Sequence, residues 1–280
     1  MRAFSLGRPL PELPEVETTR SGIEPALLGQ TVREVIVRER RLRWPIARDF
    51  ESSIRGTTVR AVERRAKYIL IRFDTGTAIL HLGMSGSLRI LDPAAPLLVH
   101  DHWDIILGSG RALRFHDPRR FGSLLFTRED PAAHPLLARL APEPLGAAFD
   151  ADYLYRASRR RKLAVKLFIM NAHIVVGVGN IYASESLFRA GIPPRRAAGR
   201  LTRAQVSRLV AAIKEVLSEA VRIGGTTLRD YVNADGAPGY FSQKLFVYER
   251  GGEPCRRCGS LVRHAVQGQR STYWCPTCQK

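Results

Sequence analysis

The sequence has no run of about 18 consecutive apolar residues, the length that a helix needs to cross a bilayer. The first ten residues carry two arginines and no apolar stretch long enough for a secretory signal. Cysteine is also scarce, with four residues that all lie at or beyond position 255. These absences exclude a membrane span, argue against export, and predict a cytoplasmic protein.

Acidic residues are in deficit. Lys and Arg number 44 against 26 Asp and Glu, which gives a formal net charge of +18 and a pI near 10.7. Much of the excess is arginine, whose planar guanidinium suits phosphate. A merely basic surface is the alternative, but the balance favours a polyanionic partner, and nucleic acid before a membrane surface.

The four cysteines form two Cys-x2-Cys pairs, Cys255 with Cys258 and Cys275 with Cys278, separated by 16 residues. This spacing is typical of a zinc ribbon. Two disulfides are the alternative, but nothing directs the chain to an oxidising compartment. Four thiolates leave no open coordination position, so the pattern predicts one structural zinc ion rather than a catalytic one.

The first half of the chain alternates short β-rich segments with turn signals, which predicts a sandwich or barrel. A helix is expected ahead of them, from Pro14 to Leu28, closed by Gly29. Two hairpin turns are predicted, at 74–76 and 108–110. The expected strands are 32–38, 68–73, 77–82, 87–91, 103–107, 112–116 and 122–127.

Residues 131–152 contain several Pro, Ala and Gly residues without a clear period and predict a linker. Helical periodicity follows at 153–170, 180–190 and 203–223, which predicts a helical second domain. Residues 224–242 hold four glycines and few large aliphatics and are expected to form a loop.

Three motifs carry chemistry. Pro11 would be a nucleophilic secondary amine if it were the first residue, whereas behind ten residues its nitrogen is a planar amide. The glycine turn before Asn180 opens a helix and could hold a phosphate, with close packing as the alternative. The segment from Asp117 to Gly122 places Arg119 and Phe121 on a tight turn, suited to insertion into DNA, although Phe121 could instead lie in the core.

The strings PELPEVET, RRAKY, HLGMSGSLRI, DPRRFG, VVGVGNIYASESLF and GGTTLRDY, followed by the cysteine pairs, occur in this order. Together they resemble formamidopyrimidine-DNA glycosylase, a bacterial repair enzyme for oxidised purines, from Pro11 to Lys280. The resemblance implies an α+β multidomain fold: an N-terminal β-sandwich with flanking helices (11–135), a helix-two-turn-helix domain (145–240) and a zinc ribbon (245–280). Residues 1–10 lie outside it.

The resemblance implies a bifunctional glycosylase and abasic-site lyase that acts on double-stranded DNA as a monomer, without an organic cofactor. Pro11 matches the nucleophile and Glu12 the acid that moves protons, while Lys67 and Arg270 match cations at the scissile phosphate. Residues 224–242 match a loop that closes over the everted lesion. The implied DNA contacts are His100, Lys162, Lys166 and Asn180, with Met84, Arg119 and Phe121 filling the void left by the flipped nucleotide.

Two alternatives stay open. The related endonuclease VIII branch removes oxidised pyrimidines, but its opening usually reads PEG, so Leu13, Met84, Arg119 and Phe121 favour the purine enzyme. If residues 1–10 are retained, the chain could bind lesions without excising them. We expect instead a misassigned start, with translation initiating at position 10 and the initiator methionine removed, or proteolytic processing that exposes Pro11.

Overall fold

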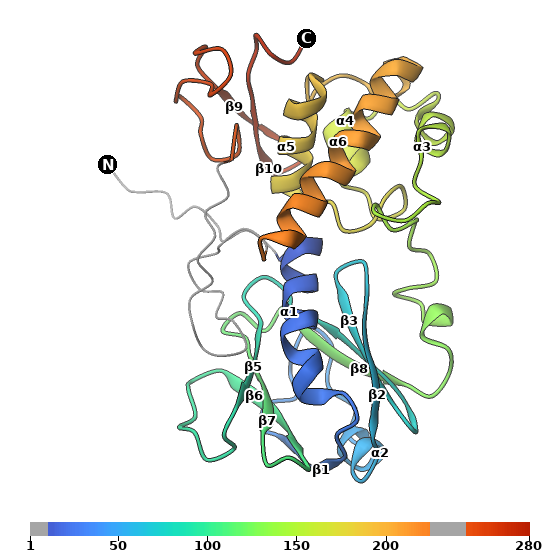
Figure 1. Cartoon of the computed structure of the whole chain (residues 1–280), viewed down its shortest axis with the longest axis vertical. Coiled ribbons are helices and arrows are strands. Elements are labelled where there is room, and N and C mark those ends of the chain that lie inside the picture. The colour runs from blue at the N-terminus through green and yellow to red at the C-terminus, as the bar shows by residue number, and fades with distance from the viewer. Residues whose placement is uncertain (1–10, 225–244) are drawn as a thin grey trace. The chain divides into compact units, whose positions relative to one another are not determined.

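The computed structural model describes residues 11–224 and 245–280 (Figure 1). They form two compact units, the first built mainly from residues 11–138 and the second from 139–223 and 245–280. The ten-residue N-terminal segment and, apart from Gly224, the predicted glycine-rich loop lie outside the described residues.

The first unit contains two four-stranded antiparallel sheets that share one apolar core, which confirms the predicted β-sandwich. Trp103 and Phe115 stack in this core with ring centroids 5.3 Å apart. One sheet has the order β1 (Val32–Val37), β6 (Asp101–Leu107), β7 (Ala112–His116), β5 (Ser87–Leu91). The other has the order β2 (Val59–Arg65), β3 (Tyr68–Phe73), β4 (Gly76–His81), β8 (Ser123–Thr127).

Strand β2 was not predicted from the sequence. Its pairing with β3 shifts register between Val59 and Ala61, so buried and exposed positions do not alternate along it. Such a bulge removes the period of two by which strands are recognised.

Helix α1 (Leu13–Leu27) lies against both sheets and contacts β2, β3 and β5 (Figure 1). Pro14 occupies its first turn, where a missing N–H costs nothing, and Gly29 follows its end with φ +75°. Val16, Ile23 and Leu27 are buried beneath the helix. A short helix, α2 (Phe50–Ile54), packs on β1, and a 3₁₀ turn, η1 (Pro131–Ala133), follows β8.

The second unit is helical, as predicted, but the expected single helix over 153–170 is wrong. It is divided into α3 (Ala151–Ser158) and α4 (Val165–Ile169). Four consecutive cations, from Arg159 to Lys162, separate the two helices, and Arg160 adopts φ +60°. Like charges and a left-handed residue both oppose helix continuation.

Helices α5 (Asn180–Ala190) and α6 (Arg203–Arg222) form the centre of this unit, with η2 (Ala198–Arg200) between them. Gly191 ends α5 with φ +70°, as only glycine adopts easily. A reciprocal capping box between Thr202 and Gln205 starts α6. The apolar face predicted for α6 is buried in the core of the unit.

The chain ends in a hairpin of β9 (Arg263–Gln267) and β10 (Arg270–Trp274). Its two turn residues, Gly268 and Gln269, have φ values of +55° and +60°, as a two-residue hairpin turn requires. The predicted ribbon architecture is therefore confirmed.

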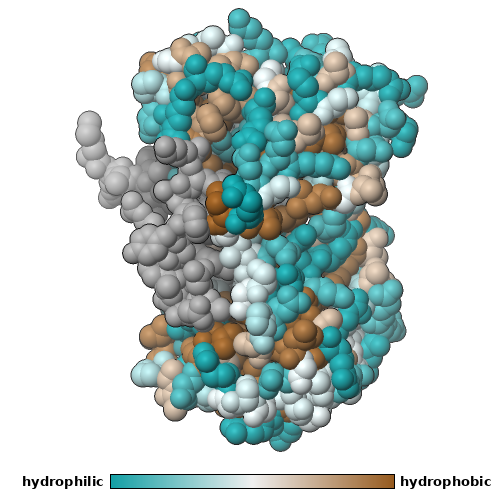
Figure 2. Space-filling model, in the orientation of Figure 1, coloured by the Kyte–Doolittle hydropathy of each residue, from teal (hydrophilic) through white to brown (hydrophobic). Residues whose placement is uncertain are grey.

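The surface visible in Figure 2 intermixes hydrophilic residues with small apolar patches. Among the described residues, no helix combines the length and apolar character that crossing a bilayer demands.

Candidate active site and nucleic-acid interface

The start of α1 fixes the backbone next to the predicted nucleophile. Glu12 is the N-cap, and its backbone N–H donates to Glu15 Oε2 at 3.0 Å while its own carboxylate accepts the N–H of Glu15. Pro11, Glu12 and Glu15 are all buried. The Pro11 ring is thus held at the positive end of the helix dipole.

Lys67 lies in the two-residue turn between β2 and β3, beside Ala66 with φ +56°. An ion pair of 2.7 Å between Arg64 Nε and Glu17 Oε2 ties this hairpin to α1. Arg20 adds a bond of 3.1 Å from its guanidinium to the Val62 carbonyl. Two connections therefore hold the turn that carries Lys67 against α1, the helix that Glu12 caps.

His81 was not among the predicted site residues. It ends β4, pairs with Tyr68, and accepts the N–H of Gly83 at Nδ1, 2.9 Å away. Burial, followed by the nearby charges of Lys67 and Arg43, lowers the pKa of His81 to about 4. The ring is therefore neutral at physiological pH, as the acceptor role requires.

Acidification should destabilise the fold through His81. Its folded-state pKa lies below the ordinary value of 6.5, so the unfolded state binds the extra proton and the stabilisation is lost as pH falls from 6.5 to 4. At 1.4 kcal/mol per pH unit the loss amounts to about 3 kcal/mol. We expect His81→Asn, whose amide oxygen can replace the acceptor, to flatten the pH dependence by about this amount in denaturant unfolding between pH 7 and 4. Parallel curves for the two proteins would contradict this.

The two segments predicted to enter DNA lie side by side, and we call residues 83–86 and 117–122 the wedge loops. A Cβ placed on Gly83 would stand 2.4 Å from the Gly122 nitrogen, so the two backbones are in direct contact. Phe121 is 45% exposed, which excludes the core alternative for it, and the Arg119 guanidinium lies 5.0 Å from its ring centroid. Met84 is half-buried.

His100 is exposed and adopts φ +80°, an unusual backbone conformation for a residue with a side chain. Its ring lies near those of His102 and His116, with centroid separations of 6.3 and 6.2 Å. The backbone carbonyl of His100 accepts the N–H of Asp117, 3.1 Å away. His100 thus adjoins the wedge loops directly.

In the second unit, the glycine turn opens α5 as predicted, but Gly179 is the N-cap and Asn180 is the first helical residue. Gly177 has φ +79°. The Asn180 Oδ1 atom is buried without a hydrogen-bond partner among the described residues. A helix N-terminus of this kind can bind a phosphate through its backbone N–H groups.

The two predicted lysine contacts are in different surroundings. Lys162 is exposed, whereas Lys166 is fully buried. The Lys166 ammonium donates to the Ser271 carbonyl at 2.7 Å and to the Thr272 hydroxyl at 2.8 Å. In this DNA-free structure the Lys166 ammonium is therefore directed into the ribbon hairpin, and its contact with DNA stays a prediction.

Arg270 begins β10 and is exposed. The turn before it packs on α4, since a Cβ on Gly268 would stand 2.8 Å from a Leu167 methyl carbon. Together with Lys166, this contact fixes the hairpin end from which Arg270 projects.

The four cysteine sulfurs lie within 4.8 Å of one another. Cys255 and Cys278 are 4.0 Å apart at Sγ, and Cys258 and Cys275 are 3.4 Å apart. Tetrahedral zinc with bonds of about 2.3 Å requires sulfur separations of about 3.8 Å. The donor set and its spacing fit one structural zinc ion.

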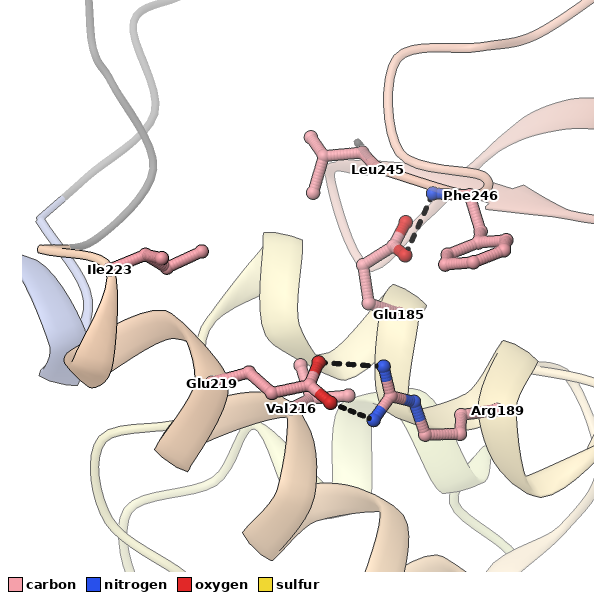
Figure 3. Close-up of a pocket in the computed structure, with 7 residues that line it drawn as sticks. All are labelled: Glu185, Arg189, Val216, Glu219, Ile223, Leu245 and Phe246. Atoms are coloured by element: carbon pink, nitrogen blue, oxygen red, sulfur yellow. Dashed lines mark hydrogen bonds and ion pairs between the residues drawn. The ribbon is translucent and has the colours of Figure 1, made fainter. Parts of the chain in front are cut away.

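A pocket of 150 Å³ lies in the second unit beside α5 and α6 (Figure 3). Arg189 and Glu219 form an ion pair of 2.8 Å across it. The Glu185 carboxylate accepts three backbone N–H groups, from Phe246, Val247 and Tyr248, each at 2.9 Å. Burial raises the pKa of Glu185, and these three bonds act in the opposite direction. The pocket wall thus anchors the backbone that enters the ribbon.

Comparison with known proteins is consistent over the whole described chain. Family models match the formamidopyrimidine-DNA glycosylase N-terminal domain at 10–124, its H2TH domain at 140–232, and a zinc finger found in FPG and IleRS at 252–280. A formamidopyrimidine-DNA glycosylase from Thioalkalivibrio sulfidiphilus is 61% identical over 97% of this chain and 100% of the relative.

Solved structures agree. The MutM (Fpg) protein of Thermus thermophilus has a TM-score of 0.86 at 41% identity, covering 96% of this chain and 98% of that one. The Lactococcus lactis Fpg in complex with DNA containing N7-benzyl-Fapy-dG has a TM-score of 0.89 at 29% identity, covering 96% and 100%. The chain belongs to the formamidopyrimidine-DNA glycosylase family.

Proposed function

We propose that this chain removes oxidised purines from duplex DNA and then cleaves the strand at the abasic site that results. The observation that carries the proposal is the fixed start of α1, where Pro11 precedes the N-cap Glu12 beside the hairpin that bears Lys67. Family membership makes the chain a base-excision repair glycosylase and abasic-site lyase.

Pro11 supplies the nucleophile once it is the first residue. Its secondary amine attacks C1′ of the damaged nucleotide, the base departs with a proton, and an iminium joins the ring nitrogen to the opened sugar. The positive end of α1 disfavours a second positive charge nearby, so it keeps more of the amine neutral and reactive at neutral pH. Glu12, adjacent and buried, moves protons between base and sugar.

The iminium acidifies the 2′ carbon, so loss of its proton breaks the 3′ C–O bond, and a second elimination breaks the 5′ bond. Each step expels a phosphate, whose charge a nearby cation stabilises. We assign this role to Lys67 in the first unit and to Arg270 in the second. Both phosphates then remain on the ends of a one-nucleotide gap.

The proposal requires that the active form lack residues 1–10. The match to the family's N-terminal domain begins at residue 10, which supports initiation there and removal of the initiator methionine. Methionine aminopeptidase trims readily before a small residue such as proline. The working chain would then begin at Pro11.

DNA is held by exposed cations and by the amide groups of α5. We assign His100, Lys162 and Asn180 to phosphate contacts, and Met84, Arg119 and Phe121 to the space that the flipped nucleotide vacates. We give Lys166 a positioning role behind Arg270, because its ammonium is bonded within the ribbon. We further propose that the protein acts as a monomer in the bacterial cytoplasm, at the nucleoid.

Substrate preference tests the purine assignment. With protein that begins at Pro11, single-turnover excision of 8-oxoguanine paired with cytosine should exceed excision of thymine glycol by at least about tenfold, since a pocket built to hydrogen-bond one base edge discriminates strongly. Duplexes of identical flanking sequence are the control. A preference for thymine glycol would move the chain to the endonuclease VIII type of activity.

A further inference from the structure

Asp117 is the first residue of the wedge loop 117–122. It follows β7, its side chain is fully buried, and no ion pair to it is found among the described residues. Burying a carboxylate is costly unless hydrogen bonds compensate. Its partners therefore indicate what the residue is for.

The carboxylate bonds to both wedge loops. Oδ1 accepts the Ser85 hydroxyl at 2.7 Å, next to Met84 in one loop. In the other loop, Oδ1 accepts the N–H of Arg119 at 3.3 Å and Oδ2 accepts the N–H of Gly122 at 2.8 Å. One rigid group thus sets the separation of the segments that carry Met84 and Phe121.

The Asp117 backbone extends the connection to a third segment. Its N–H donates to the His100 carbonyl, and its carbonyl accepts a hydrogen bond of 2.7 Å from His102 Nε2. Because a carbonyl only accepts, His102 carries its proton on Nε2. Three segments with predicted DNA contacts therefore meet at this one residue.

The turn that Asp117 stabilises is strained. Arg120 adopts φ +55°, which costs free energy for a residue with a side chain. The Arg120 N–H donates to the Asp117 carbonyl at 3.2 Å, and its guanidinium pairs with Glu39 at 3.0 Å. Without these bonds the strained turn would relax and Phe121 would lose its position.

We propose that Asp117 is a positioning residue for base extrusion, which holds Met84, Arg119 and Phe121 in the spacing needed to enter the DNA stack before DNA arrives. The proposal rests on the proposed function of these three residues. If the wedge loops are already ordered, no conformational entropy is lost in ordering them while the base is extruded. We therefore expect Asp117 to increase the rate of the step that removes the base from the stack.

The test separates base extrusion from sugar chemistry. Asp117→Asn preserves the size of the side chain, but its NH₂ group must point toward at least one of the groups that now donate to the carboxylate. We therefore expect single-turnover excision of 8-oxoguanine from duplex DNA to fall on the order of 10–100-fold. Cleavage of a preformed abasic site, which has no base to extrude, should change by less than about threefold. A 2-aminopurine next to the lesion should report slower opening to the same extent as excision.

Ser85→Ala removes only the hydrogen bond from the Ser85 hydroxyl to Asp117, which joins the two wedge loops. It provides the test of the proposal if Asp117→Asn does not fold. It should show the same selective loss at smaller magnitude, while Asp130→Asn, at the exposed cap of η1, should leave both activities unchanged. Equal losses on both substrates, or wild-type excision by Ser85→Ala, would overturn the proposal. Failure of the wild-type protein to excise either lesion or to be trapped on DNA would instead refute the proposed function.

Discussion

A protein that begins at Pro11 is expected to form a borohydride-trapped covalent adduct with abasic-site DNA, whereas the chain that retains residues 1–10 is expected to form none. In the longer chain the Pro11 nitrogen is part of a planar peptide bond, and its lone pair is delocalised into the carbonyl. Loss of a nucleophile typically costs on the order of a thousandfold or more. Excision of 8-oxoguanine should fall by at least this factor.

Two controls distinguish chemistry from binding. If residues 1–10 block only the amine, the two forms should bind DNA with similar affinity. The longer form would then be a protein that binds lesions without excising them. Pro11→Gly in the shorter form keeps a terminal amine and should retain part of the trapping. Lys67→Ala in the longer chain tests whether a lysine amine substitutes. Full activity of the 280-residue chain with Lys67 replaced would refute the Pro11 mechanism.

Removal of zinc is expected to abolish tight DNA binding and to reduce excision by about a hundredfold or more. The segment 245–280 has a single two-stranded hairpin and few buried apolar side chains, among them Val262 and Tyr273. So small a segment cannot form a sufficient core, and structural zinc contributes roughly 10–16 kcal/mol to folding in such cases. Without the metal, Arg270 would no longer be held in place.

Removal of zinc should also destabilise the part of the second unit that packs against the ribbon. Lys166 is buried and bonds to Ser271 and Thr272 of β10, so unfolding of the hairpin leaves a buried ammonium without these partners, which is costly. Cys275→Ser should reproduce the effect of chelation, measured as zinc content, DNA affinity and thermal unfolding. Leu261→Ala, which changes a side chain of the same segment that is 62% exposed and removes no thiolate, is the matched control. Tight DNA binding by the metal-free protein would contradict this.

The sequence predicted the elements whose signals are local. The helix that ends at Gly191, the hairpin turns and the four-cysteine ribbon each depend on residues close together in the chain. Prediction from the sequence was incomplete or wrong where the local pattern was weak. The bulge in β2 removes the alternation by which a strand is recognised, and the cationic segment around Arg160 divides a helix that was predicted to be continuous.

In the candidate site, too, local motifs identified residues, whereas contacts between residues far apart in the sequence were not predicted. Family motifs indicated Pro11, Glu12 and Lys67, but not that the Arg64–Glu17 ion pair ties their elements together, because the two residues are 47 positions apart. Burial of Lys166 and the accepting role of His81 also depend on residues from other elements. Asp117 stood inside a recognised motif, yet only the structure reveals its bonds to three segments.

The reciprocal bonds between Glu12 and Glu15 have a consequence for gene expression. They fix the backbone that follows Pro11, so the nitrogen that we propose as the nucleophile has a defined position. One additional residue would shift the chain terminus by about 3.8 Å, and displacements near 1 Å already cost about a hundredfold in rate. If Pro11 is the nucleophile, as we propose, the fraction of synthesised molecules that is active would depend on whether the amine of Pro11 is exposed as the first residue.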